Sequence, residues 1–141
     1  MFGYCNVGKT MPYYDFSKNT SMYEMFSWCG FETIPLLNFG SVTSMPTTYF
    51  YQPFYQCRNL VNLGGLEDLG KSFTSATTLD MGSCIVLSNE SVTNIANTVY
   101  DMNQNTSIQT ATVKFFLHVY SKITDEQKAK FAAKGWAVVS A

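Results

Sequence analysis

The pentapeptide MFGYC (residues 1–5) returns as MFSWC (residues 25–29), so that Met, Phe and Cys recur together at one fixed interval. Two further pairs recur at nearly the same interval, shorter by a single position: Met11 with Ile34, and Ser21 with Ser44. Both intervals fall within the period of about 20 to 50 residues that is typical of repeat proteins. The sequence therefore predicts that one structural unit is used several times.

Two later and weaker copies of the unit follow. The third begins at FYQC (54–57), after a local insertion at 49–53, and the fourth includes SVTNIANTVYDM (91–102). We assign the 141 residues to a single domain with these divisions: repeats at 1–24, 25–52, 53–83 and 84–121, and a C-terminal cap at 122–141.

Two segments have the spacing of an amphipathic helix. Ser21 and Glu24 have the Ser-x-x-Glu form of a capping box, which satisfies free backbone N–H groups at a helix start. The apolar residues beside them fall at i, i+3, i+4 and i+7, on one helical face: Met22, Met25, Phe26 and Cys29. A similar spacing follows Ser91, the expected N-cap of a second helix, at Val92, Ile95, Ala96, Val99 and Met102.

Four short apolar segments are predicted to be strands because they are bounded by turn-forming residues: TIPLLNF (33–39), LGGLEDL (63–69), TTLDMG (77–82) and ATVKFFLHVY (111–120). Asp15, Asn38 and Asp80 suit the turn that leaves a strand, since a short Asx side chain can bond the backbone two residues on. Residues 79–82 are expected to occupy, in a later repeat, the position that residues 15–17 occupy in the first.

A strand and a helix within so short a unit cannot bury their own apolar face, so successive units are expected to stack with their strands in parallel. The predicted fold is α/β, a short right-handed solenoid with a parallel sheet. Four cysteines follow the repeat, and they are expected to be buried, stacked thiols: Cys5, Cys29, Cys57 and Cys84. Disulfides and zinc ligation are less favoured, because equivalent side chains point in parallel and no Cys-x-x-Cys pair is present.

The last twenty residues predict a helix and strand that cap the stack. Thr124 and Gln127 form a capping box, and Gly135 can end the helix in the left-handed conformation before a closing strand at 136–139. Three lysines lie on this helix: Lys128, Lys130 and Lys134. A solvated helix face is favoured for them over a basic binding patch.

Composition excludes several classes of function. Charged residues make up 13% of the chain and the formal net charge is −1, so the field that attracts nucleic acid is missing. No stretch approaches the roughly 18 apolar residues of a membrane span, and the N-terminus lacks the pattern of a signal peptide. We expect no nucleic acid partner and no membrane insertion by this segment, and any export signal would lie outside it.

A series of blocks in order resembles the BspA-like leucine-rich-repeat surface proteins of gut and oral bacteria. The blocks are Met-Phe-x-x-Cys, Ile-Pro-x-Leu-Asn-Phe, Ser-Val-Thr-Ser-Met, NLVNLGGLEDLGKSF, LDMGSC, SVTNIANTVYDMN and KITDEQKAKFAAKGWAV. Gly8, where the family pattern has Leu, and the insertion at 49–53 depart from that pattern. The resemblance implies a leucine-rich-repeat-like solenoid, display at the cell surface or outside the cell, and adhesion or binding to a host ligand.

Catalysis is not expected. His118 is the only histidine, and in KFFLHVY it is more typical of an ordinary strand residue than of a partner to a nucleophilic cysteine. Glu67, Asp68 and Asp80 do not form a recognisable acid–base pair. We predict no catalytic residues, no cofactor and no metal, with a hydrolase using His118 as a distant third hypothesis.

Two classes of function remain. The first is a non-enzymatic recognition module, in which either the sheet face or the insertion presents aromatic side chains to a protein or glycan ligand. The aromatic residues of the insertion region are Tyr49, Phe50, Tyr51 and Tyr55. The second is a structural spacer that displays another domain and has no ligand. A cluster of neighbouring exposed aromatics in the folded protein would favour recognition.

The start of the chain gives one further expectation. Met1 falls in the middle of a unit, on its helical side. We therefore expect the chain to be a fragment of a longer array, whose N-terminal edge pairs with another copy or frays.

Overall fold

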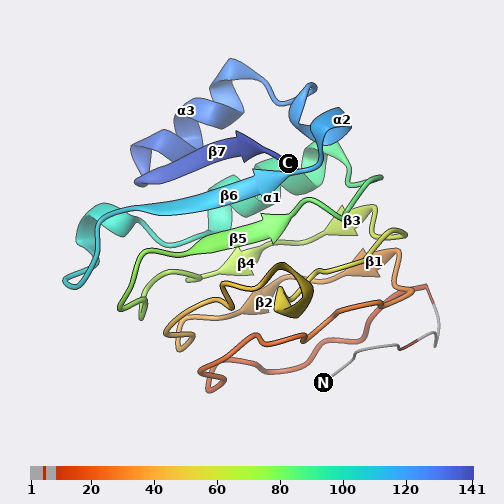
Figure 1. Cartoon of the computed structure of the whole chain (residues 1–141), viewed down its shortest axis with the longest axis horizontal. Coiled ribbons are helices and arrows are strands. Elements are labelled where there is room, and N and C mark those ends of the chain that lie inside the picture. The colour runs from red at the N-terminus through yellow and green to blue at the C-terminus, as the bar shows by residue number, and fades with distance from the viewer. Residues whose placement is uncertain (1–4, 6–8) are drawn as a thin grey trace.

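A computed structural model describes Cys5 and residues 9–141 of the chain (Figure 1). The fold is mixed α/β and is built from short parallel strands with few helices. We expected the N-terminal edge at Met1 to pair with another copy or to fray, and Met1 lies outside the described residues.

Short strands from successive turns of the chain pair in parallel. β1 (Thr33–Ile34) pairs with β3 (Asn62–Leu63), and β2 (Leu37–Asn38) pairs with β4 (Leu66–Glu67). Isolated parallel bridges join Thr10 to Thr33 and Ser21 to Ser44. The register between the first two units, predicted from the return of Ser21 as Ser44, is confirmed.

A larger parallel sheet forms further along the chain. Its strand order is β5 (Thr78–Met81), β6 (Ala111–Phe115) and β7 (Trp136–Ser140). Figure 1 shows α1 (Asn89–Thr98) and α3 (Asp125–Ala133) behind this sheet. Helix α1 packs against β3, β4 and α3, so the two helices continue the side of the molecule that β1 to β4 begin.

Phenylalanine rings from successive turns stack in the core. Phe26 lies 5.2 Å from Phe54 in a stacked arrangement and 6.5 Å from Phe39 edge to face, measured between ring centroids. Phe16 stacks on Phe39 at 5.6 Å. Such pairs stabilise a core beyond the area that they bury.

Residues 22–29 do not form the predicted helix. The N–H groups of Met25, Ser27 and Cys29 bond to oxygens three residues earlier. Alternate N–H groups, those of residues 24, 26 and 28, donate instead to carbonyls of the next turn at residues 51, 53 and 55. So short a helix has little stability of its own, and these bonds to the neighbouring turn take its place.

The predicted burial in this segment is nevertheless confirmed. Met22, Met25, Phe26 and Cys29 are all buried. Positive φ angles at Glu24 and Trp28 bend the backbone between consecutive turns, and they let the same side chains face inward without a helix.

Two other predicted elements need correction. The segment ATVKFFLHVY is a strand only to Phe115, because α2 (Leu117–Tyr120) follows, and His118 lies on that helix. Helix α1 is capped by Ser88 and not by Ser91, whose backbone N–H donates to the Ser88 hydroxyl. It ends at Thr98, and a separate 3-10 turn, η2 (Met102–Gln104), follows.

The predicted Asx turns are confirmed. The Oδ1 atoms of Asp15, Asn38 and Asp80 each accept a hydrogen bond from the backbone two residues on, at 2.8 to 3.0 Å. The predicted equivalence of residues 79–82 with residues 15–17 is wrong. Asn38, the counterpart of Asp15, pairs with Glu67 in β4, whereas Asp80 lies in the three-stranded sheet and its N–H donates to Gln52.

The C-terminal helix and strand form as predicted, with the Thr124–Gln127 capping box, Gly135 at a φ of 75° and strand β7. The Gln127 side chain also donates to Asn89 and Thr93, which ties α3 to α1. Lys134 is half-buried and donates to the carbonyls of Asn97 and Val99 at the end of α1. A free solvated face is therefore the wrong description of this lysine, which caps a helix C-terminus.

Candidate functional site

Six aromatic side chains gather on the surface where the segment at 21–29 meets the insertion at 49–53 and the residues just after it. We call them the aromatic strip: Tyr23, Trp28, Tyr49, Phe50, Tyr51 and Tyr55. Five are exposed, with exposed fractions between 40% for Tyr51 and 59% for Phe50, and Tyr55 is half-buried. A group of large exposed rings marks a surface where binding is common.

Backbone hydrogen bonds between two turns hold the strip together. The N–H of Glu24 donates to the oxygen of Tyr51 at 3.0 Å, and the N–H of Trp28 donates to the oxygen of Tyr55 at 2.8 Å. Consequently Tyr23 stacks on Tyr51 with ring centroids 4.7 Å apart, and Trp28 meets Tyr55 edge to face at 5.9 Å.

The insertion supplies the other half of the strip. It contains η1 (Tyr49–Tyr51), a single 3-10 turn at the front of Figure 1. Tyr49, Phe50 and Tyr55 contact one another edge to face, with ring centroids 4.9 to 5.8 Å apart. The buried Gln52 side chain anchors this turn, because its amide donates to Pro46 O and its oxygen accepts from Asp80 N.

A groove of about 310 Å³ adjoins the strip. Its lining combines apolar and hydrogen-bonding groups: Tyr49, Gln56, Arg58, Gly82, Ser83, Ile85 and Phe116. Its volume lies at the small end of the roughly 300 to 1,000 Å³ typical of ligand pockets. Tyr49 belongs to both the strip and the groove, so a single ligand could contact the two.

Tyr49 is positioned by polar partners on the neighbouring turns. Its hydroxyl lies 2.9 Å from the Ser83 hydroxyl, and the Lys114 ammonium lies 5.8 Å from its ring centroid. Lys114 also forms an ion pair with the buried Asp80 at 2.7 Å. The cation beside Tyr49 is thus neutralised by a carboxylate.

Desolvation, followed by the neighbouring Tyr51, raises the pKa of Tyr23. Its hydroxyl, like that of any tyrosine, is protonated at neutral pH, and the shift moves its ionisation to a higher pH than usual.

The structure brings three of the four predicted residues, Tyr49, Phe50 and Tyr55, into mutual ring contact. The fourth, Tyr51, lies in the same 3-10 turn, but its ring stacks on Tyr23. Sequence reasoning missed Tyr23 and Trp28. The repeat could have found them, because each stands about one unit before the aromatic residue that it contacts.

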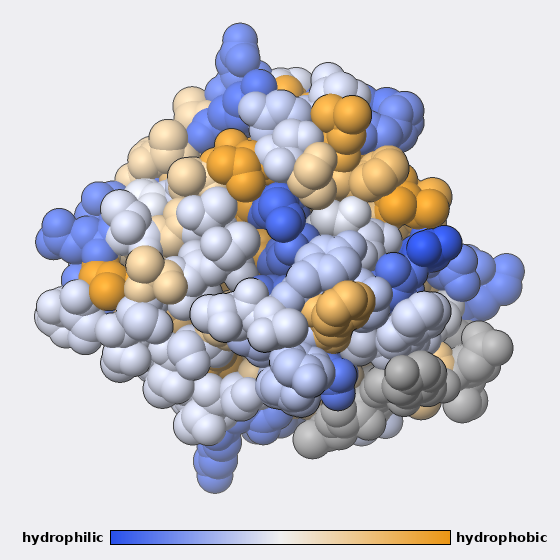
Figure 2. Space-filling model, in the orientation of Figure 1, coloured by the Kyte–Doolittle hydropathy of each residue, from blue (hydrophilic) through white to orange (hydrophobic). Residues whose placement is uncertain are grey.

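Figure 2 shows that the face around η1 has mostly intermediate hydropathy, as expected for tyrosine and small polar residues. Strongly hydrophobic side chains are more frequent toward β6, β7 and α2. The strip is therefore an aromatic surface with little aliphatic character.

A second groove, of about 270 Å³, lies over β1, β3 and the start of α1. It is lined by Thr33, Ile34, Pro35, Asn62, Leu63, Gly64, Glu90, Ser91 and Asn94. Ser91 and Asn94 are already bonded to the backbone of residues 61 and 63, so they serve the fold.

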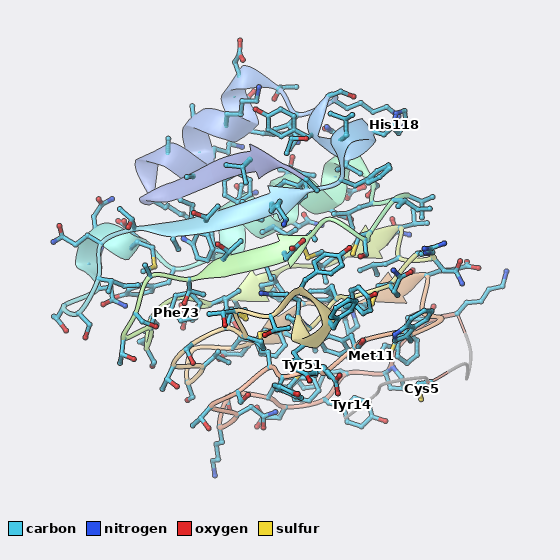
Figure 3. All side chains as sticks on the ribbon, viewed as in Figure 1. Cys5, Met11, Tyr14, Tyr51, Phe73 and His118 are labelled. Atoms are coloured by element: carbon cyan, nitrogen blue, oxygen red, sulfur yellow. The ribbon has the colours of Figure 1, made fainter. Side chains whose placement is uncertain are left out.

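His118 is exposed on α2 and lines neither groove, and Figure 3 places it far from Tyr51. In the described part of the chain, no cluster of three or more His, Cys, Asp or Glu side chains could hold a metal ion. The described helices are all too short to cross a bilayer.

The four cysteines are thiols and not disulfides, and the expected burial is confirmed for Cys29, Cys57 and Cys84. Cys5 is half-buried. Burial raises the pKa of Cys29 to about 11 and that of Cys57 to about 12. The Cys57 thiol donates to Phe26 O at 2.8 Å, as a buried structural thiol does.

These shifts predict alkaline destabilisation. Between pH 9 and 12 the folded protein keeps the Cys57 proton while the unfolded chain loses it, so stability falls as pH rises. The loss from one such group approaches about 1.4 kcal/mol per pH unit. We expect Cys57→Ala to lose stability less steeply than the wild type when both are unfolded in urea from pH 7 to 10.5. If the stability of both proteins fell equally steeply with pH, the raised pKa of Cys57 would be contradicted. The other groups that titrate at alkaline pH are the same in both proteins.

Comparisons of this chain with family models, with curated proteins and with solved structures found no match.

Proposed function

We propose that this chain is a non-enzymatic recognition module that binds a protein or glycan ligand through its aromatic strip. The observation that carries the proposal is a set of six aromatic rings, five of them exposed, that form two contacting groups: the Tyr23–Tyr51 pair, and Trp28, Tyr49, Phe50 and Tyr55. Backbone bonds between two turns hold both groups in place. Rings fixed in this way lose little conformational freedom on binding, which favours affinity. Tyr and Trp are also the residues most enriched at binding hot spots.

We further propose that the module is part of a right-handed leucine-rich-repeat-like solenoid of the BspA-like surface proteins. The parallel bridges between the first two turns, and the pairing of β1 with β3 and of β2 with β4, support this. Stacked units place equivalent residues side by side in the same way. Display at the bacterial cell surface or outside the cell follows from the same resemblance.

The test is binding of the isolated protein to an array of extracellular matrix proteins and glycans. We expect binding to at least one probe, and we expect Tyr23→Ala combined with Tyr51→Ala to weaken it at least tenfold. Both side chains are exposed, so their removal should leave the fold intact. Tyr13→Ala, which removes an exposed ring outside the strip, is the matched control and should bind like the wild type.

If the double variant bound as tightly as the wild type, the binding site would lie outside the strip. No binding to any probe would favour a structural spacer that displays another domain.

A further inference from the structure

The polarity of the strip narrows the class of ligand. Five of its six rings belong to Tyr or Trp, which combine an apolar face with a polar edge, and the adjoining groove adds one aliphatic side chain, that of Ile85. A surface that binds a protein partner through a hydrophobic core would present several aliphatic side chains as well. A sugar ring instead offers weakly positive C–H groups to an aromatic face and hydroxyl groups around its edge.

The neighbouring groove supplies hydrogen-bonding groups at the end of this platform. Arg58 carries five N–H donors, of which Nε–H donates to Gln56 Oε1 at 2.5 Å. The Ser83 hydroxyl, which contacts the Tyr49 hydroxyl, also lines the groove. A linear ligand that stacks on the strip would therefore meet polar groups at Tyr49, where the strip adjoins the groove.

The charges near the site favour an uncharged ligand. Glu24 lies close enough to Tyr23 to act on its hydroxyl, Arg58 lines the groove, and the nearby Lys114 is paired with Asp80, so neither sign of charge dominates. Arg58 is the only unneutralised cation among the groove residues that the structure describes.

We propose that the aromatic strip and its groove bind a linear neutral glycan, whose pyranose rings stack on the exposed aromatics while a terminal ring bonds to Arg58, Gln56 and Ser83. This inference rests on the proposed function and specifies its ligand class. Its binding energy is divided between stacking on the rings and hydrogen bonding in the groove, so the two contributions can be removed separately.

The chain offers an internal probe for the experiment. It has two tryptophans, and Trp136 is buried at 2% exposure whereas Trp28 is 48% exposed. Stacking of a sugar on Trp28 should shift the fluorescence emission of that residue to shorter wavelength and leave the Trp136 signal unchanged.

The test titrates the protein with soluble β-glucan, xylan, galactomannan and chitin oligosaccharides, with hyaluronan as the acidic comparison and fibronectin and collagen as protein comparisons. Affinity electrophoresis supplies a second readout. We expect at least one neutral glycan to retard the protein and shift its fluorescence. Trp28→Ala combined with Tyr51→Ala should weaken binding at least tenfold, and Arg58→Ala about threefold to tenfold.

Two further variants separate binding from folding. Trp28→Phe keeps an aromatic ring, so it should keep most of the electrophoretic retardation while losing the fluorescence shift. Tyr13→Ala should behave like the wild type in both measurements.

Failure of this inference is distinguishable from failure of the proposed function. Binding only to fibronectin or collagen, lost in the strip variant, would overturn the glycan assignment and leave a recognition module. Binding only to hyaluronan would overturn the neutral class. No binding to any of these probes would overturn the glycan assignment and count against the recognition module.

Discussion

Phe26→Ala is expected to lower the free energy of unfolding by about 4 kcal/mol, within the roughly 3 to 5 kcal/mol typical of a fully buried phenylalanine. Phe26 is 0% exposed and contacts the rings of Phe16, Phe39 and Phe54. Alanine would leave a cavity at the centre of this stack. Because domains are stable by only about 5 to 15 kcal/mol, much of the total would be lost.

Urea unfolding followed by circular dichroism measures this loss. Phe26→Leu keeps much of the volume and should cost less, about 1.5 kcal/mol. Phe50→Ala is the surface control, since Phe50 also contacts two rings but is 59% exposed, and we expect a change within about 1 kcal/mol. Similar losses for Phe26→Ala and Phe50→Ala would show that the phenylalanine stack is not the core of the folded protein.

Gly64→Ala is expected to destabilise the protein by about 3 kcal/mol, at the upper end of the roughly 1 to 3 kcal/mol typical of overpacking. The Gly64 N–H donates to Ile34 O at 2.9 Å, which draws two turns of backbone together. A Cβ atom at Gly64 would lie 2.4 Å from Leu36 N and 2.9 Å from the carbonyl carbon of Pro35. These are backbone atoms, so the clash can be relieved only by moving the turns apart and breaking bonds between them.

Gly40→Ala is the matched control. Its Cβ would meet the Asp68 Cβ at 3.1 Å, a contact that a shift of a few tenths of an ångström relieves. We expect a loss below about 1 kcal/mol in thermal unfolding, partly offset by the lower entropy of the unfolded alanine chain. If Gly40→Ala cost as much as Gly64→Ala, the close approach of the two turns would not exist in solution.

Much of the fold was predictable where the signal is local. The C-terminal helix and strand follow from a capping box, a glycine in the left-handed conformation and a run of β-formers, all within 124–140. The Asx turns at Asp15, Asn38 and Asp80 are local in the same sense. These features depend on residues within a few positions of one another.

The candidate site was predictable only in part. The aromatic residues of the insertion are conspicuous in the sequence, but Tyr23 and Trp28 lie a whole repeat before the rings that they contact. Their place in the strip depends on which turn the segment at 21–29 pairs with. The groove brings residues near 56 together with Ser83 and Phe116, which are distant from them in the sequence. No local pattern predicts such a site.

The sequence by itself determined the repeat, the register of its first units and the buried residues, including Met22, Met25, Phe26 and Cys29. Burial follows the spacing of the apolar side chains, which can be read directly from the sequence. Only the tertiary structure decided that these four residues lie on consecutive turns and not on a helix. Each backbone N–H can bond within its own segment or to a neighbouring turn, and the choice depends on the carbonyl groups at 51, 53 and 55 that the fold brings beside it.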